Sequence, residues 1–537
     1  MKTFDALHNP YHSHRMTTYG RKGMVATSQP LAAQAGRDIL KKGGNAVDAA
    51  IATAACLTVV EPTSNGIGGD AFALVWMKDQ LYGLNASGPS PSSISIDAVK
   101  EKGCEHIPKY GFIPVTVPGA PAAWAELSDK FGLLDFQEVL APAISYAEEG
   151  FPLTPILGKH WKEAYERFSE QLTEEQFSAW FQTFAPDGRA PEVGEMWSSP
   201  DHASTLKRIA ETKGNAFYKG ELADRIHEFS KTYGGFLRKE DLMAYKPEWV
   251  EPISVNYRGY DVWEIPPNGQ GLVALMGLNM TKHFQFEETL RVKDYHTQIE
   301  ALKLAYADGH QHITERGSMA HSVDALLSEG YGQERAEKIM DVAQLPQAGE
   351  PSQGGTVYLA TADREGNMVS FIQSNYEGFG SGLVVPGTGI ALQNRGHNFS
   401  MDPTHVNKLE GNKRTFHTII PGFLTKGDDP LGPFGVMGGF MQPQGHMQVI
   451  SHFIDCHLNP QMALDAPRWQ WTKEKELWVE PGFPNHIAQG LKRKGHNVQV
   501  ALDSSSFGRG QMIIRNPDNG VYAGGTESRT DGSIAVW

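Results

Sequence analysis

The sequence predicts an α/β protein in which helices cover sheets, and two patterns support this fold class. The N-terminal part alternates strand and helix patterns, and the chain becomes strand-rich after residues 346–355, a loop of Pro, Gly, Ser and Gln. Residues 120–345 combine more charge with a helical spacing of apolar residues, which is typical of amphipathic helices over a sheet. Because strand patterns occur on both sides of the loop, we expect one continuous sheet system rather than two independent domains.

The order of the predicted elements begins after a polar N-terminal segment. Residues 1–23 contain several histidines and few apolar residues, and we interpret them as a flexible arm. Residues 24–87 predict a strand, a helix that runs to Lys42, a stop at Gly43-Gly44, a buried helix that follows Asn45, a glycine-rich turn and a β-hairpin. Further helices are expected at 121–132, 221–235 and 294–309, and further strands at 356–363, 368–374, 389–394, 432–439, 508–516 and 520–525.

The composition is that of a globular protein, and it excludes several functions. Of the 537 residues, 40% are hydrophobic and 20% are charged, and a net charge of -14 leaves no basic face for nucleic acid or an anionic membrane. Three cysteines are too few for a disulfide framework or a cysteine-rich metal site. The N-terminus has no apolar run of signal-peptide length, so we expect a cytoplasmic protein.

Neither a metal nor a cofactor is predicted. Histidines gather at 446–457 and 8–14, but neither run has the spacing of metal ligands. The turn "SNGIGGD" lacks both the glycine spacing of a dinucleotide site and the lysine of a P-loop. We therefore expect any chemistry to come from the side chains and backbone of the protein itself.

A Gly-Gly-Thr step begins the first strand after the loop, with Thr356 as its third residue. If the following hairpin turns near Glu365, Ser374 lies opposite Thr356 and two hydroxyls face each other. The strand pattern alone favours the simpler interpretation of Thr356 as a surface β-forming residue.

The chemistry of the step supports a second interpretation of Thr356. A preceding glycine leaves an open peptide whose carbonyl the hydroxyl can attack, and hydrolysis after this N-to-O acyl shift would make Thr356 a new N-terminus. A free α-amine beside a hydroxyl is a nucleophile that carries its own base. Adjacent backbone N–H groups at Gly438 and Gly439 could then stabilise the oxyanion, although most Gly-Gly pairs are tight turns.

Motifs along nearly the whole chain resemble the γ-glutamyltransferase family. They occur in the family order from about Gly23 to the C-terminus: "LAAQAGRDILKKGGNAVDAAIATAACLTVVEPTSNGIGGD", "VTVPGAPAAW", "GGFLRKEDLMAY", "GGTVYLATADREGN", "FGSG", "MGGFMQPQGHMQ" and "AGGTESRTDG". The resemblance implies an N-terminal-nucleophile (Ntn) hydrolase with a four-layer αββα sandwich and helical covering segments. It also implies a precursor that cuts itself between Gly355 and Thr356 into a large subunit, 24–355 behind the arm, and a small subunit, 356–537.

Matched position by position, the resemblance assigns the catalytic groups. Thr356 matches the nucleophile, and Ser374 matches a hydroxyl on the second strand that supports it. Gly438 and Gly439 match the pair that holds the oxyanion. The chemistry of the family is therefore expected here.

The substrate-binding positions depart from the family pattern. Ser87 stands where family members hold the glutamyl α-carboxylate with an arginine, and Asn398 stands where an aspartate binds the α-amino group. Tyr376 stands where the family has an asparagine, although Asn375 is adjacent. Thr415 and Phe416 replace a pair of serines.

These replacements predict a changed specificity. The lost arginine and aspartate contacts are charge-assisted and worth roughly 1.5 to 3 kcal/mol each. Their loss would weaken selection for the glutamyl zwitterion by about 100-fold to 10,000-fold. Arg395 and His397, or Arg414, are candidates to replace the missing cation. The pattern is closer to the branch described as γ-glutamyltransferase-like or cephalosporin acylase-like.

The predicted function is amide cleavage through a threonyl acyl-enzyme, with transfer of the acyl group to water or an amine. The donor implied by the resemblance is a γ-glutamyl amide of the glutathione type. Two alternatives stay open, an acylase for other short acidic acyl groups such as glutaryl, and a catalytically weak binding protein. The expected partners are a small-molecule amide and the two subunits of one precursor, with a homo-oligomer of that unit left open.

Overall fold

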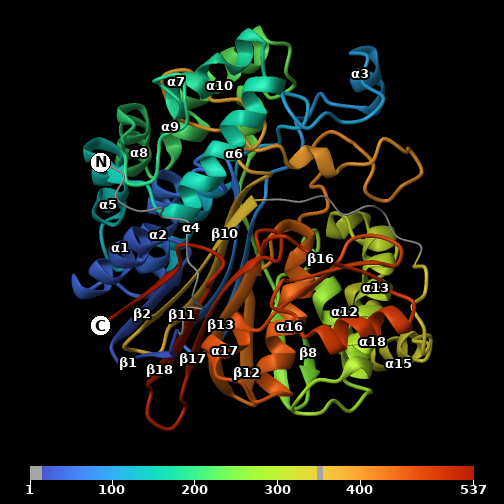
Figure 1. Ribbon diagram of the computed structural model, residues 1–537. Helices are drawn as coiled ribbons and strands as arrows, with labels where there is room; N and C mark the ends of the chain where they lie inside the picture. The colour runs from blue at the N-terminus through green and yellow to red at the C-terminus, as the bar shows by residue number, and fades with distance from the viewer. Residues whose placement is uncertain (1–14, 347–354) are drawn as a thin grey trace.

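Two antiparallel sheets face each other at the centre of the computed structural model, which describes residues 15–346 and 355–537 (Figure 1). Sheet I contains, in spatial order, β19 (Ser533–Val536), β2 (Gly23–Thr27), β10 (Gly355–Asp363), β11 (Met368–Tyr376), β3 (Asp70–Met77), β4 (Gln80–Ala86) and β7 (Glu248–Val250). Sheet II contains β1 (Thr18–Gly20), β18 (Tyr522–Thr526), β17 (Arg509–Arg515), β13 (Asp429–Met437), β12 (Gly422–Lys426), β9 (Tyr260–Glu264) and β8 (Ile253–Tyr257).

Helices cover the outer face of each sheet. Those on the side of sheet I are α1 (Pro30–Lys41), α2 (Ala46–Val60), α4 (Ala120–Phe131), α5 (Phe136–Glu149) and α8 (Pro200–Thr212). Those on the side of sheet II are α12 (Gly271–Thr281), α13 (Val292–His312), α14 (Val323–Leu326), α15 (Glu329–Ala336), α16 (Gln442–Ile454), α17 (Pro460–Asp465) and α18 (Asn485–Arg493). The arrangement is the predicted αββα sandwich.

Smaller elements extend the sandwich, and several helices form a lobe at the top of Figure 1. The remaining helices are α3 (Ile96–Glu101), α6 (Pro155–Gln171), α7 (Ser178–Phe184), α9 (Asn215–Tyr218), α10 (Glu221–Thr232) and α11 (Lys239–Ala244). The remaining strands are β5 (Phe151–Pro152) and β6 (Met196–Trp197), and β14 (Trp469–Trp471), β15 (Glu476–Val479) and β16 (Asn497–Val500). Among the described residues, every helix is too short or too polar to cross a bilayer.

The apolar core follows these layers. Phe72, Tyr358 and Phe423 belong to the cluster between the two sheets. All residues of α2 are buried because this helix lies between sheet I and α5, which explains why it is apolar all round. Its start is the predicted one, since the Asn45 side chain accepts hydrogen bonds from the N–H groups of Val47 and Asp48.

The hairpin formed by β10 and β11 has the predicted register. Val357 pairs with Gln373, and the pairing continues to Ala362 and Met368. The ladder becomes irregular beyond Val357, where Gly355 pairs with Tyr376. The described start of β10 therefore lies at a bulge, which turns Thr356 out of the regular ladder.

Two predictions for local structure need correction. Residues 389–394 form no strand, because only single bridges occur, Val384 with Ala391 and Gly68 with Leu392, and Gly389 has a φ of 69°. Residues 18–20 of the expected arm are the edge strand β1, which pairs with β18. Residues 1–14 of that arm and 347–354 of the expected loop lie outside the described residues.

Candidate active site

The hydroxyls of Thr356 and Ser374 meet at the end of the hairpin, as the register predicted. Their Oγ atoms lie 3.1 Å apart, and both side chains are fully buried. The backbone N–H of Tyr376 donates to the Ser374 Oγ over 2.8 Å. Tyr376 has a φ of 77°, so the chain bends sharply directly after this strand.

Ser374 is supported by a buried group of residues that we call the charged cluster, Arg395, Asp70 and His417. Arg395, also fully buried, directs Nη2 to the Ser374 Oγ at 3.4 Å and Nη1 to the Thr418 hydroxyl at 2.6 Å. Its guanidinium also lies 4.3 Å from the centre of the Tyr376 ring. The Ser374 oxygen thus accepts from the Tyr376 N–H and from Arg395 in addition to its contact with the Thr356 hydroxyl.

Asp70 supplies the negative charge of this cluster. Its carboxylate accepts hydrogen bonds from the Gln393 amide at 2.9 Å and from His417 Nε2 at 2.9 Å. The Ile419 N–H donates to His417 Nδ1, so the proton of this imidazole is on Nε2.

Burial dominates the protonation of the cluster. It raises the pKa of Asp70 to about 7, and the positive charge of Arg395 opposes that rise. Burial also lowers the pKa of Arg395 to about 10, and burial together with Arg395 holds the pKa of His417 well below its usual value. His417 is therefore a neutral hydrogen-bond donor, and Arg395 remains charged near neutral pH.

Gly438 and Gly439 lie directly after β13, which faces the hairpin across the two sheets. Both have positive φ, 137° and 60°, a conformation that a side chain would disfavour. The Gly439 carbonyl accepts a hydrogen bond from the Gln270 amide at 2.8 Å, and the Gly438 carbonyl accepts one from the Met441 N–H. The Gly438 carbonyl shares its peptide plane with the Gly439 N–H, so the bond from Met441 helps to orient one of the two N–H groups of the candidate oxyanion site.

The four positions that we call the acyl pocket, Ser87, Asn398, Thr415 and Phe416, belong to one hydrogen-bonded region. The Asn268 amide bridges it, because Nδ2 donates to the Ser87 hydroxyl at 3.2 Å and to the Thr415 carbonyl at 2.8 Å. Asn398 Nδ2 donates to the Phe416 carbonyl at 3.1 Å. The region is neutral at the two positions where the family pattern has charges.

Tyr376 joins the hydroxyl pair to the acyl pocket. Its phenol donates to Asn398 Oδ1 over 2.6 Å, while its backbone contacts Ser374. On its other side Phe416 is packed by rings, since it stacks on His310 and Phe440. Asn375, adjacent in sequence, is fully buried near Gly66 and Gly69.

The three candidate replacement cations occupy different places. Arg414 Nε donates to the Ser87 carbonyl at 2.9 Å, and its Nη1 lies 3.2 Å from Glu248, so this guanidinium is at the acyl pocket. Arg395 lies below the hydroxyl pair. The His397 ring instead bonds the Ile107 carbonyl through Nδ1.

Three functional candidates were missed at the sequence level, namely Asp70, His417 and Gln270. Each comes from a segment far from Thr356 in the chain, and none has a local pattern that distinguishes it from a core residue. His446 of α16 bonds Glu264 rather than a residue of the site.

One group among the described residues has the spacing of metal ligands, His296, Glu300 and His496. The Lys303 ammonium bonds Glu300 at 2.7 Å, and His296 Nδ1 bonds His496 Nε2 at 2.8 Å. These contacts pair Glu300, His296 Nδ1 and His496 Nε2 with protein groups, whereas His496 Nδ1 is buried without a hydrogen-bond partner.

Comparison with known proteins identifies the family of this chain. The family model described as Gamma-glutamyltranspeptidase matches residues 32–537. The chain belongs to the γ-glutamyltranspeptidase family. The protein is thus an enzyme of that family, which is the family that the sequence motifs resemble.

Similar proteins extend over the full length of this γ-glutamyltranspeptidase-family chain. The crystal structure of cephalosporin acylase from Bacillus halodurans is 63% identical, with a TM-score of 0.97, and the match covers 100% of this chain and 99% of that one. The glutathione hydrolase-like YwrD proenzyme of Bacillus subtilis (strain 168) is 38% identical over 96% of this chain and 98% of its own. The oxamate amidohydrolase proenzyme of Klebsiella pneumoniae is 33% identical over 98% and 99%.

Proposed function

We propose that the protein is a self-processing amidohydrolase and acyltransferase whose nucleophile is Thr356. The observation that carries this proposal is the 3.1 Å contact between the Thr356 and Ser374 hydroxyls at the start of β10. Two relatives are named proenzymes, which supports maturation by cleavage of this chain. The proposal explains the Thr356 hydroxyl and the paired glycines at this end of the hairpin as parts of one nucleophilic site in a self-processing precursor.

Maturation begins when the Thr356 Oγ attacks the Gly355 carbonyl. The peptide C–N bond breaks as an ester forms, and the proton of the hydroxyl ends on the released amine. Water then hydrolyses the ester, which leaves a carboxylate on Gly355 and a free α-amine on Thr356. This amine is the base that the nucleophile needs.

Turnover uses the same hydroxyl. Thr356 Oγ attacks the amide carbonyl of the substrate while its α-amine takes the proton, and the N–H groups of Gly438 and Gly439 stabilise the oxyanion. The α-amine returns the proton to the leaving amine. Water or a second amine then releases the acyl group from the ester.

We propose a short acidic acyl group without an α-ammonium as the preferred donor. Asn398 offers the α-ammonium no charge, whereas Arg414, whose Nη1 already faces Glu248 and Glu315, brings a cation to Ser87 that an acyl carboxylate could share. A glutaryl amide satisfies both conditions, and the similar structure described as cephalosporin acylase supports an acylase. A γ-glutamyl amide such as glutathione is the second donor, which the family and the glutathione hydrolase-like relative support.

The test is intact-mass spectrometry of the purified protein, followed by incubation with glutathione and with a glutaryl amide in parallel. We expect two fragments that divide between Gly355 and Thr356, with faster release of amine from the glutaryl amide. Faster cleavage of glutathione would overturn the donor assignment. A processed protein that releases no amine from either donor would instead support the binding-protein alternative.

A further inference from the structure

Arg395 is a buried cation beside the nucleophile, and the proposed mechanism makes no use of its charge. Its side chain is fully buried, and its Nη2 lies 3.4 Å from the Ser374 Oγ, which in turn lies 3.1 Å from the Thr356 Oγ. A buried guanidinium is costly unless a carboxylate balances its charge. The way in which this charge is balanced therefore decides which ions the site tolerates.

The hydrogen bonds of Arg395 go to neutral groups. Its Nη1 donates to the Thr418 hydroxyl at 2.6 Å, and its Nε is buried without a hydrogen-bond partner. In the part of the chain that the structure describes, no carboxylate lies within ion-pair distance of this guanidinium. Asp70 attracts it from farther away, and burial raises the pKa of Asp70 to about 7. The countercharge of Arg395 is therefore incomplete near neutral pH.

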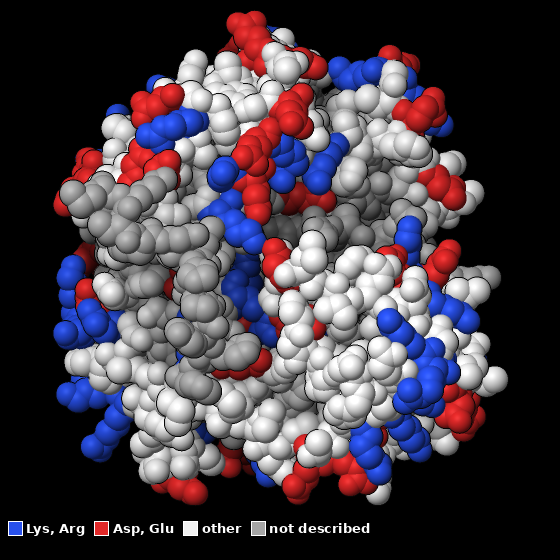
Figure 2. Space-filling view, in the orientation of Figure 1, with Lys and Arg blue, Asp and Glu red and all other residues white. Residues whose placement is uncertain are grey.

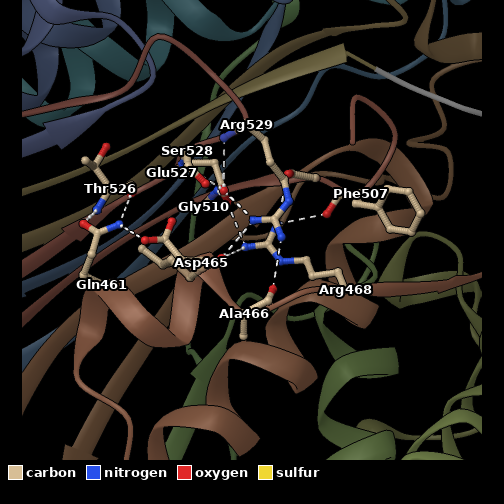
Figure 3. Close-up of polar contacts among 12 residues, drawn as sticks. Gln461, Asp465, Ala466, Arg468, Phe507, Gly510, Thr526, Glu527, Ser528 and Arg529 are labelled. Atoms are coloured by element: carbon tan, nitrogen blue, oxygen red, sulfur yellow. Dashed lines mark hydrogen bonds and ion pairs between the residues drawn. The ribbon is translucent and has the colours of Figure 1, made fainter. Parts of the chain in front are cut away.

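Two other arginines with buried side chains are paired with carboxylates. In the cluster of Figure 3, Arg468 and Arg529 both bond Glu527, at 2.8 Å and 2.6 Å. On the surface, Lys and Arg side chains are interspersed with Asp and Glu side chains (Figure 2), and dissolved ions screen each charge. Arg395 has neither kind of compensation, so its positive charge acts on any group that enters the site.

The backbone places Arg395 next to the part of the acyl pocket that Asn398 occupies. These two residues are the first and the last of η3 (Arg395–Asn398), a single 3-10 turn, in which side chains three positions apart lie on the same side. Tyr376 connects them, because its ring lies against the guanidinium and its phenol donates to Asn398 Oδ1 over 2.6 Å. An acyl chain that extends from Thr356 to Asn398 therefore passes through the field of Arg395.

A positive charge on the acyl chain near Asn398 would meet this field without a compensating anion in the acyl pocket. The four acyl-pocket residues are neutral, and Asn398 Oδ1 already accepts from the Tyr376 phenol. Like charges a few ångströms apart repel each other strongly where water is largely excluded, because the interaction grows as the effective dielectric constant falls. A carboxylate on the same chain would be attracted instead.

We propose that Arg395 determines the charge specificity of the enzyme by repelling acyl groups that carry a cation near Asn398. The accepted donors are then amides of neutral or anionic acyl groups. Acyl groups with an ammonium at this position, the γ-glutamyl group included, are rejected by repulsion and not only by a missing contact. The inference rests on the proposed function and extends it from the loss of a binding charge to the presence of an opposing one.

The test uses four 4-nitroanilides that form two pairs, 4-aminobutanoyl with pentanoyl and γ-glutamyl with glutaryl. One member of each pair carries an ammonium that the other lacks. We expect kcat/KM in the parent to be at least about 100-fold lower for the member with the ammonium. Arg395→Gln keeps a hydrogen-bond donor but removes the charge, so it should reduce this ratio by about 10-fold in both pairs. Any loss of rate that is common to both members cancels in the ratio.

Arg395→Lys is the matched control, because it keeps the charge and should keep the ratio. Arg414→Gln removes the cation at Ser87, so it should lower kcat/KM for the glutaryl donor relative to the pentanoyl donor and leave the effect of the ammonium in place.

The same ratio in Arg395→Gln and the parent would overturn the inference. Equal kcat/KM for the 4-aminobutanoyl and pentanoyl donors in the parent would also overturn it, and this outcome needs no variant. A parent that cleaves none of the four donors would refute the proposed function itself, which separates the two failures.

Discussion

The hydroxyl pair and the acyl pocket lie on either side of Tyr376 but differ in how they are held. Thr356 and Ser374 are fully buried and are supported by the charged Arg395, which also donates to the Thr418 hydroxyl and lies over the Tyr376 ring. The acyl pocket is held by neutral contacts such as the one between Asn398 and the Phe416 carbonyl.

The difference shows which parts of the site depend on backbone conformation and which depend on single side chains. The hydroxyl pair depends on strand register, and the glycine pair depends on positive φ, so few substitutions are tolerated there. The acyl pocket presents replaceable side chains from loops, so specificity can change while the chemistry is retained.

The largest effect is expected at the nucleophile. Thr356→Ala should leave a single uncut chain and lower the rate of amide cleavage by at least about 10⁴-fold, because the attacking oxygen is removed. Intact mass and initial rates measure both. Thr356→Ser keeps the hydroxyl and should still be cut, whereas two fragments from Thr356→Ala would remove Thr356 from the mechanism.

The second-largest effect is expected at the glycine pair, Gly438 and Gly439. Gly438→Ala places a Cβ 3.1 Å from the Gly508 Cα at a φ of 137°, which would shift the peptide that faces the oxyanion. We expect kcat to fall by about 10²- to 10³-fold with the fold intact, as for the loss of an oxyanion donor. Gly482→Ala, where the nearest atom is 3.9 Å away, is the control and should be silent. A fully active Gly438→Ala would place the oxyanion elsewhere.

The charged cluster should make the stability of the protein depend on pH, whereas the neutral acyl pocket should not. The folded pKa of Asp70, about 7, lies above its ordinary value of 3.8, so the folded state binds the proton more tightly. This contribution to stability is complete below about pH 4 and is lost as the pH rises to about 7. Asp70→Asn removes it, so the stability of the variant relative to the parent should rise by about 3 kcal/mol from pH 5 to pH 8.

Denaturant unfolding at several pH values measures this difference, best in the uncut Thr356→Ala background. Glu61, with a pKa raised to about 7, titrates in both proteins and cancels in the comparison. A difference in unfolding free energy that is constant with pH would show that Asp70 stays ionised throughout.

The smallest effect is expected in the acyl pocket. Asn398→Asp keeps an acceptor for the Tyr376 phenol and adds a charge for an α-ammonium. The ratio of kcat/KM for a γ-glutamyl anilide to that for a glutaryl anilide should rise by about 10-fold. Asn398→Ser adds no charge and should leave the ratio unchanged. The same ratio in Asn398→Asp and the parent would mean that the α-amino group is not read at this position.

From the sequence we predicted most of the catalytic positions, where the residues of the family are retained, but few of the residues that support them. The contact between the Thr356 and Ser374 hydroxyls followed from the register of a symmetric hairpin, because strand register is set by local alternation. The bulge at Thr356 could not be predicted, since it depends on the segments packed beside it. Arg395 was a candidate cation for the acyl pocket, but its guanidinium donates to the hydroxyls of Ser374 and Thr418 instead.

The position of β10 between β2 and β11 has a consequence for the mature protein. A cut before Thr356 would leave both sheets built from strands of two separate molecules, with β12, β13, β17 and β18 pairing beside β8, β9 and β1. Refolding, which is a first-order event in the precursor, would become a second-order one and lose the effective concentration that the peptide link supplies. Dilution would then oppose reassembly, and the working lifetime of the enzyme would be set by how rarely its two chains part.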